Sequence, residues 1–105
     1  MKLLRTIFNC INYKNLKKKY RYLDECHALG ILASAQLNSE KNKVKEPLEN
    51  ESALGNLLKC KDELYEVMNE LTQKEMNPQR VLEEVGDAAA YLVGVIACMK
   101  KELNK

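Results

Sequence analysis

The feature that most constrains the fold is a stretch of twelve residues, Ala88–Met99, that contains no charged side chain. It lies in a segment that begins with Asn77-Pro78, a typical helix start, because Asn caps a helix and Pro fits its first position. The pattern predicts a helix from Pro78 to about Leu103. A helix that is apolar all round is buried all round, so this helix needs neighbours on every side.

Two further helices are predicted upstream of this one. The first runs from about Asn15 to Leu37, and its apolar stripe at helical spacing consists of Tyr22, Cys26, Leu29 and Ala33. The second starts between Pro47 and Ser52 and ends near Lys74. Its apolar line has the alternating spacing of three and four that is typical of a packed bundle seam, and it consists of Leu54, Leu57, Leu64, Met68 and Leu71.

These patterns predict an all-α fold, a helical bundle of three main helices plus a short N-terminal amphipathic helix. We expect residues 1–14 to form this amphipathic extension and residues 15–105 to form one domain, with residues 38–52 as a polar connection. Few helices in a chain of 105 residues bury only a modest core. They cannot surround the apolar third helix, so oligomerisation is expected to complete the bundle.

Charge and cysteine usage limit the partners and the cellular location that are expected for this chain. Residues 1–45 hold ten basic against three acidic side chains. This balance favours a solvated basic face, with phosphate contacts as an alternative, and a nucleic-acid partner is not expected. The four cysteines form no close pair, which is typical of reduced, packed thiols in a cytoplasmic protein. No apolar run reaches the roughly 18 residues of a membrane span.

Two pairs of acidic residues carry the chemical signal. Glu63 and Glu66 are three residues apart, as are Glu84 and Asp87, so each pair shares one face of its helix. Four carboxylates beside a common core repel one another unless a cation binds them, and all-oxygen ligands suit Mg²⁺ or Mn²⁺. Two ordinary explanations stay open, since such pairs are common on exposed helices and acids are favoured near a helix N-terminus.

The order and spacing of these pairs resemble a known signature. Glu63-x-x-Glu66, seventeen intervening residues and Glu84-x-x-Asp87 resemble the ExxE…ExxD motif of the MazG-like, all-α nucleoside triphosphate pyrophosphohydrolases. The surrounding segments 57–66 and 82–92 are also similar to the helices of that family. The resemblance covers about residues 54–97, roughly half of the chain.

The resemblance implies a specific activity and site. Members of this family cleave the bond between the α and β phosphates of nucleoside triphosphates, which gives a monophosphate and pyrophosphate. By this resemblance Glu63, Glu66, Glu84 and Asp87 would ligate Mg²⁺, with Mn²⁺ as an alternative, and Glu63 would accept the proton of the attacking water. A homodimer or homotetramer is implied as well. Phosphate contacts are expected from Lys100, Lys101 or the basic N-terminal region.

Two alternatives remain beside this prediction. One is a non-catalytic helical-bundle interaction module with a basic N-terminal face. The other is a related dUTP or phosphoribosyl-ATP pyrophosphatase, because the same four acids serve all of these enzymes. The base-recognising part of the chain would decide between substrates.

Overall fold

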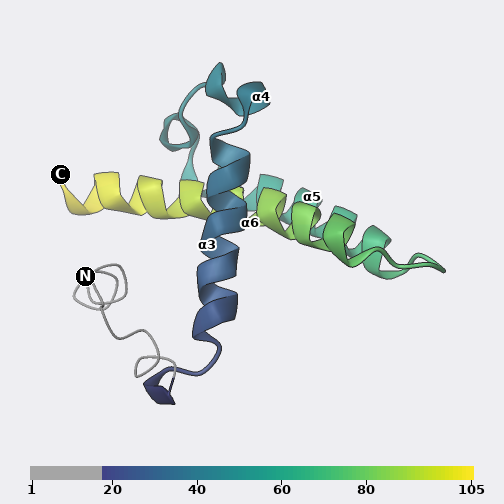
Figure 1. Ribbon diagram of the computed structural model, residues 1–105. Helices are drawn as coiled ribbons and strands as arrows, with labels where there is room; N and C mark the ends of the chain where they lie inside the picture. Colours follow the sequence, from purple (N-terminus) through teal and green to yellow (C-terminus); the bar gives the residue numbers. More distant parts are fainter. Residues whose placement is uncertain (1–17) are drawn as a thin grey trace.

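The computed structural model describes residues 18–105, and it confirms the all-α fold class (Figure 1). Its helices are α3 (Leu23–Leu37), α4 (Glu40–Lys43), α5 (Ala53–Leu71) and α6 (Pro78–Leu103), with a short 3₁₀ helix, η1 (Leu48–Asn50), before α5. The predicted N-terminal extension, residues 1–14, lies outside the described residues. No helix within residues 18–105 is long and apolar enough to cross a membrane.

α5 and α6 form an antiparallel pair, and α3 crosses this pair (Figure 1). α3 and η1 both pack on α6, whereas α3 hardly touches α5. The crossing point lies at Gly86, where an added Cβ would stand 3.0 Å from the backbone oxygen of Leu32. The absence of a side chain at Gly86 therefore lets α3 approach α6 closely.

The starts of the two long helices follow from local sequence. Asn77 caps α6, because its Oδ1 accepts hydrogen bonds from the backbone N–H groups of Gln79 and Arg80, and Pro78 occupies the first turn. Ser52 caps α5 in the same way, since its Oγ accepts a hydrogen bond from the Gly55 N–H at 2.8 Å. The predicted start and end of α6 are confirmed, whereas α5 begins at Ala53, one residue beyond the predicted range of Pro47 to Ser52, because Ser52 is its N-cap.

The predicted first helix starts too early. Tyr22 has φ 60° and ψ 27°, a left-handed conformation that a right-handed helix cannot contain. α3 therefore begins at Leu23, and its first-turn bond runs from the Cys26 N–H to the Tyr22 carbonyl at 3.0 Å. Of the predicted apolar stripe only Ala33 is buried, while Tyr22, Cys26 and Leu29 are exposed.

The predicted seam of the second helix is turned away from α6 in the single chain. Its members Leu54, Leu57, Leu64, Met68 and Leu71 are 48–65% exposed. The buried residues of α5 are Asn56 and Cys60 instead. α5 also ends at Leu71, three residues before the predicted end near Lys74.

α6 is buried on one side and uncovered on the other. Its buried positions carry small side chains, namely Gly86, Ala88, Ala89, Ala90, Gly94 and Cys98. Its large side chains remain partly exposed, namely Leu92, Val93, Ile96 and Met99. The single chain therefore does not bury the apolar run all round, and the cover expected there is missing from the single chain.

The predicted polar connection, residues 38–52, contains α4 and η1. Its end is fastened to the α5–α6 pair by two contacts of buried groups. The Asn56 side-chain amide donates to the Leu48 carbonyl at 2.8 Å, and the Cys98 thiol donates to the Glu51 carbonyl at 3.2 Å. These bonds fix the path of the connection across the pair.

Candidate metal centre

Three of the four predicted ligands meet between α5 and α6. Glu63 on α5 and Glu84 and Asp87 on α6 each offer a carboxylate oxygen, and these three atoms lie within 4.8 Å of one another. All three residues are half-buried. We call this group the three-carboxylate cluster. Glu66 is exposed and lies outside it, so its role as a fourth ligand stays a prediction.

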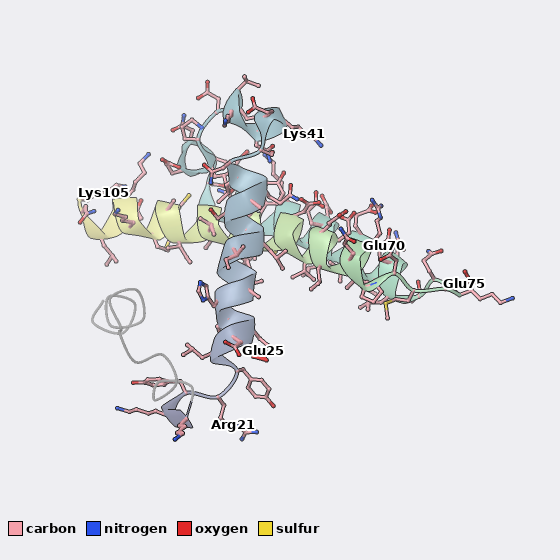
Figure 2. The ribbon with its side chains drawn as sticks, viewed as in Figure 1. Arg21, Glu25, Lys41, Glu70, Glu75 and Lys105 are labelled. Atoms are coloured by element: carbon pink, nitrogen blue, oxygen red, sulfur yellow. The ribbon has the colours of Figure 1, made fainter. Side chains whose placement is uncertain are left out.

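The packing of α5 against α6 explains why these acids meet. Asn56 lies against Gly94 at one end of the pair, and Glu70 pairs with Arg80 near the other end, at 3.3 Å. In this antiparallel register Glu63 stands opposite Asp87. Glu84 is three residues before Asp87 on the same face of α6. It therefore lies about one helical turn closer to residues 72–77, the hairpin turn that joins α5 to α6. Figure 2 shows Glu70 toward this end of the pair.

Burial and mutual repulsion disfavour the charged forms of two of these acids. The pKa of Glu63 is raised, mainly because the group is desolvated, and next because Asp87 and Glu66 carry like charge; the positive charge of Lys41 opposes this. The pKa of Glu84 is raised by desolvation and by Asp87, and Arg80 opposes this shift. The negative charge of Glu66 contributes to both shifts, so Glu66 adds to the field of the cluster from outside it.

Arg80 is a cation at the edge of the cluster. Its guanidinium lies 3.3 Å from a carboxylate oxygen of Glu70, 3.7 Å from Glu83 and 3.8 Å from Glu84. The neighbouring acids, led by the hydrogen bond to Glu70, raise the pKa of Arg80. Arg80 therefore neutralises part of the charge on the hairpin side of the cluster, while Glu63 and Asp87 lie on the side away from it.

A cavity of about 230 Å³ opens beside Glu63 and Asp87. Ala90 and Tyr91 of α6 also line it, together with the end of α3 and the connection between α3 and α5. That connection contributes two basic side chains, Lys41 and Lys45. The cavity is thus lined by two ammonium groups and by three carboxylates, namely Glu63, Asp87 and, from the same connection as the lysines, Glu46.

The two lysines were not predicted as site residues. The sequence instead suggested phosphate contacts from Lys100, Lys101 or the basic N-terminal region as a whole. Lys100 and Lys101 lie in the last turn of α6 and do not line the cavity. Lys41 and Lys45 belong to the basic part of the chain and are spaced by four residues, which was the available signal.

The donor set fits a hard divalent cation. All three groups are carboxylates, and no cysteine or histidine joins them among the described residues. Such oxygen ligands suit Mg²⁺ or Mn²⁺ rather than zinc. A bound cation would also relieve the repulsion and desolvation that raise the pKa values of Glu63 and Glu84.

No protein-family model, no curated protein and no solved structure matches this chain. Function therefore has to be argued from the residues and their geometry. The two observations that bear on it are the three-carboxylate cluster and the cavity that adjoins it.

Proposed function

We propose that this chain is a Mg²⁺-dependent nucleotide pyrophosphohydrolase of the MazG-like kind. It would cleave the bond between the α and β phosphates of ribo- or deoxyribonucleoside triphosphates, giving a monophosphate and pyrophosphate. The observation that carries the proposal is the convergence of Glu63, Glu84 and Asp87 beside a cavity that Lys41 and Lys45 also line. A phosphate chain needs both features, a metal held by oxygen ligands and cations that balance its remaining charge.

The proposal assigns the acidic residues two roles, metal binding and proton transfer. Glu63, Glu84 and Asp87 would hold the Mg²⁺, with Glu66 as the fourth ligand that the sequence resemblance implies. A bound Mg²⁺ neutralises phosphate charge and lowers the pKa of bound water. Glu63 is our candidate for the proton acceptor, because its carboxylate lines the cavity beside the proposed metal.

An assembly of chains belongs to the same proposal. A homodimer or homotetramer would cover the large apolar side chains that α5 and α6 leave exposed, such as Leu64, Met68 and Ile96. A cytoplasmic location is also proposed, since the three cysteines of the described part of the chain are all free thiols.

The exposed apolar side chains also favour one alternative, a helical interaction module without catalysis. The two candidates differ in their response to metal. A Mg²⁺-dependent enzyme gains thermal stability from Mg²⁺ with a non-hydrolysable nucleotide, because a ligand that binds only the folded state stabilises it by mass action. A module of this kind gains nothing from either addition.

A pyrophosphate-release screen tests the activity directly. The full chain is assayed with Mg²⁺ over the common nucleoside triphosphates, dUTP and phosphoribosyl-ATP. Asp87→Asn and Glu66→Gln are expected to lower the rate by at least about 100-fold, since even residues that only support metal ligands are worth about 10–100-fold. Glu75→Gln, in the exposed hairpin turn (Figure 2), is the control.

The results separate the claims. Release from no substrate would reject the proposed activity. Wild-type rates in Asp87→Asn would show that the site is assigned to the wrong residues. Loss in Asp87→Asn but not in Glu66→Gln would restrict the metal ligands to the three-carboxylate cluster.

A further inference from the structure

The two lysines that line the cavity belong to a short segment that is anchored to the end of α3. α4 follows directly on α3, and two side chains tie it to the Gln36 carbonyl at the end of α3. Asn42 donates to this carbonyl at 2.6 Å and Ser39 at 3.0 Å. Lys41 is therefore held on a fixed turn, and Figure 2 shows it on the connection beyond the end of α3.

The lysines of this segment differ in their partners. Lys43 forms an ion pair with Glu40 at 2.9 Å and does not line the cavity. Lys41 and Lys45 line the cavity, and within residues 18–105 neither ammonium group has a carboxylate oxygen within ion-pair distance. Glu46 of the same segment also lines the cavity, and its carboxylate accepts a hydrogen bond from the Asn50 side-chain amide at 2.9 Å. The ammonium groups of Lys41 and Lys45 therefore remain available to an anion in the cavity.

The contents of the cavity can be argued from its charges and size. Its volume of about 230 Å³ is several times the roughly 30 Å³ that one water molecule occupies in the liquid. Without a cation, the carboxylates of Glu46, Glu63 and Asp87 would repel an anion. A divalent cation on Glu63 and Asp87 reverses that, and the anion can then contact the metal on one side and the lysines on the other. The charge of Lys41 already reaches Glu63 across this space.

We propose that Lys41 and Lys45 form a phosphate subsite, which holds the diphosphate group of the ligand against the metal-bearing wall. This inference rests on the proposed function for the metal, and it goes further by assigning the cavity to the phosphate chain instead of the base. Lysine suits this role as a point charge with several donors. Both lysines act in binding, so their removal should weaken ligand affinity more than turnover.

The test measures binding of inorganic pyrophosphate by titration calorimetry with the full chain in Mg²⁺. The variants are Lys41→Ala, Lys45→Ala and, as the matched control on the same segment, Lys43→Ala. The wild type should bind pyrophosphate, and each cavity variant should bind about tenfold more weakly, as expected for one charged hydrogen bond. Lys43→Ala should stay within about twofold. Circular dichroism checks that every variant is folded.

A parallel titration uses a non-hydrolysable nucleoside triphosphate and the corresponding nucleoside. The affinity for the triphosphate should fall in Lys41→Ala and Lys45→Ala, whereas the affinity for the nucleoside should not change in either variant. If the nucleoside is the ligand that loses affinity, the cavity holds the base and the inference is overturned. If pyrophosphate binding is absent in the wild type, or unchanged in both cavity variants, the inference is also overturned.

Failure of the proposed function would look different. In that case pyrophosphate binds through Lys41 and Lys45, but no substrate is hydrolysed in the release screen. The subsite would then stand and the enzymatic activity would fall. Hydrolysis with an unchanged KM in Lys41→Ala and Lys45→Ala would have the opposite meaning, since the activity would stand and the subsite would fall.

Discussion

The side-chain oxygen of Asn56 lies 2.7 Å from the point where a Cβ at Gly94 would stand. Asn56 is the one polar side chain of the described residues that is fully buried. Its amide nitrogen donates to the carbonyls of Leu48 and Ser52, at 2.8 and 3.1 Å, while its oxygen has no hydrogen-bond partner. The two bonds hold the oxygen against α6, so this contact sets the register that brings Glu63 opposite Asp87.

Gly94→Ala is expected to destabilise the fold by about 1–3 kcal/mol, the usual cost of overpacking. The added methyl group would meet the Asn56 oxygen and, at 3.0 Å, the Cβ of Leu48. Asn56 cannot give way without losing its own hydrogen bonds. Chemical denaturation with urea measures the change.

Gly30→Ala is the matched control for this prediction. Gly30 also lies in a helix, has no positive φ, and an added Cβ there meets nothing within 4 Å. It should stabilise the protein by about 0.4–1 kcal/mol, because alanine has less freedom to lose on folding. A Gly94→Ala variant as stable as Gly30→Ala would mean that Asn56 does not pack against α6 as described.

The metal-free protein should lose stability as the pH rises. The pKa of Glu63 is raised in the folded state by desolvation and by Asp87. Folding therefore takes up protons, and the free energy of unfolding falls as pH rises from the ordinary carboxyl pKa to the raised one. The deficit then persists at neutral pH. Thermal melts in EDTA across pH 4–8 measure this slope.

Glu63→Gln should flatten that slope and raise the midpoint at neutral pH by a few degrees. The same variant should lose the stabilisation that Mg²⁺ gives to the wild type, because one of the three ligands is gone. Glu75→Gln should behave as the wild type in both respects. Identical pH slopes in wild type and Glu63→Gln would contradict the assignment of a strained carboxylate to this position.

The cysteines should differ sharply in their reactivity. Cys26 is exposed, whereas Cys60 and Cys98 are buried. Burial, with a smaller contribution from Glu63, raises the pKa of the Cys60 thiol and so reduces the reactive thiolate. In a Cys10→Ser background, Ellman's reagent should label one thiol quickly and two only on unfolding.

Cys26→Ser in the same background should remove the fast phase and leave the slow ones. Rapid labelling of all three thiols in the native protein would show that the α5–α6 contact around Cys60 opens readily. The measurement needs only the absorbance of the released thiolate over time.

The exposed apolar line of α5 should control assembly. Leu64 is 49% exposed and lies in this line, so a charge there would be buried in an interface between chains. Leu64→Glu is expected to shift the protein from dimer or tetramer to monomer in size-exclusion chromatography with light scattering. Val44→Glu is the control, since Val44 on the connection is 90% exposed and isolated from that line. A wild type that is monomeric at all concentrations would contradict the proposed assembly.

The parts of the fold that local sequence decides could be predicted. Asn77-Pro78 marks the start of α6 because the capping groups are adjacent in the chain. The meeting of Glu63 with Glu84 and Asp87 was also expected, chiefly because the order and spacing of the two acidic pairs resemble a known signature. The start of α6 needs only the chemistry of a helix end, and the helix period places each acidic pair on one face of its helix.

The parts that depend on distant contacts could not be predicted. The apolar stripe at Tyr22 fitted a helix well, but the backbone there turns left-handed before α3. The leucine line of α5 satisfied the bundle pattern, yet Asn56 and Cys60 face α6. The lysines of the cavity were missed because their place depends on how the connection crosses the α5–α6 pair.

The way α3 is attached predicts an order of assembly during folding. α5 and α6 are joined by the short turn of residues 72–77. The chain between α3 and this pair is longer, residues 38–52, and α3 packs on α6 but hardly touches α5. Short loops close at lower entropic cost. We therefore expect the α5–α6 pair to form early, with the three-carboxylate cluster already assembled between the two helices. We expect the cavity with Lys41 and Lys45 to form last, when α3 packs on Gly86. The folding chain would then bring its metal ligands together before the anion site is complete.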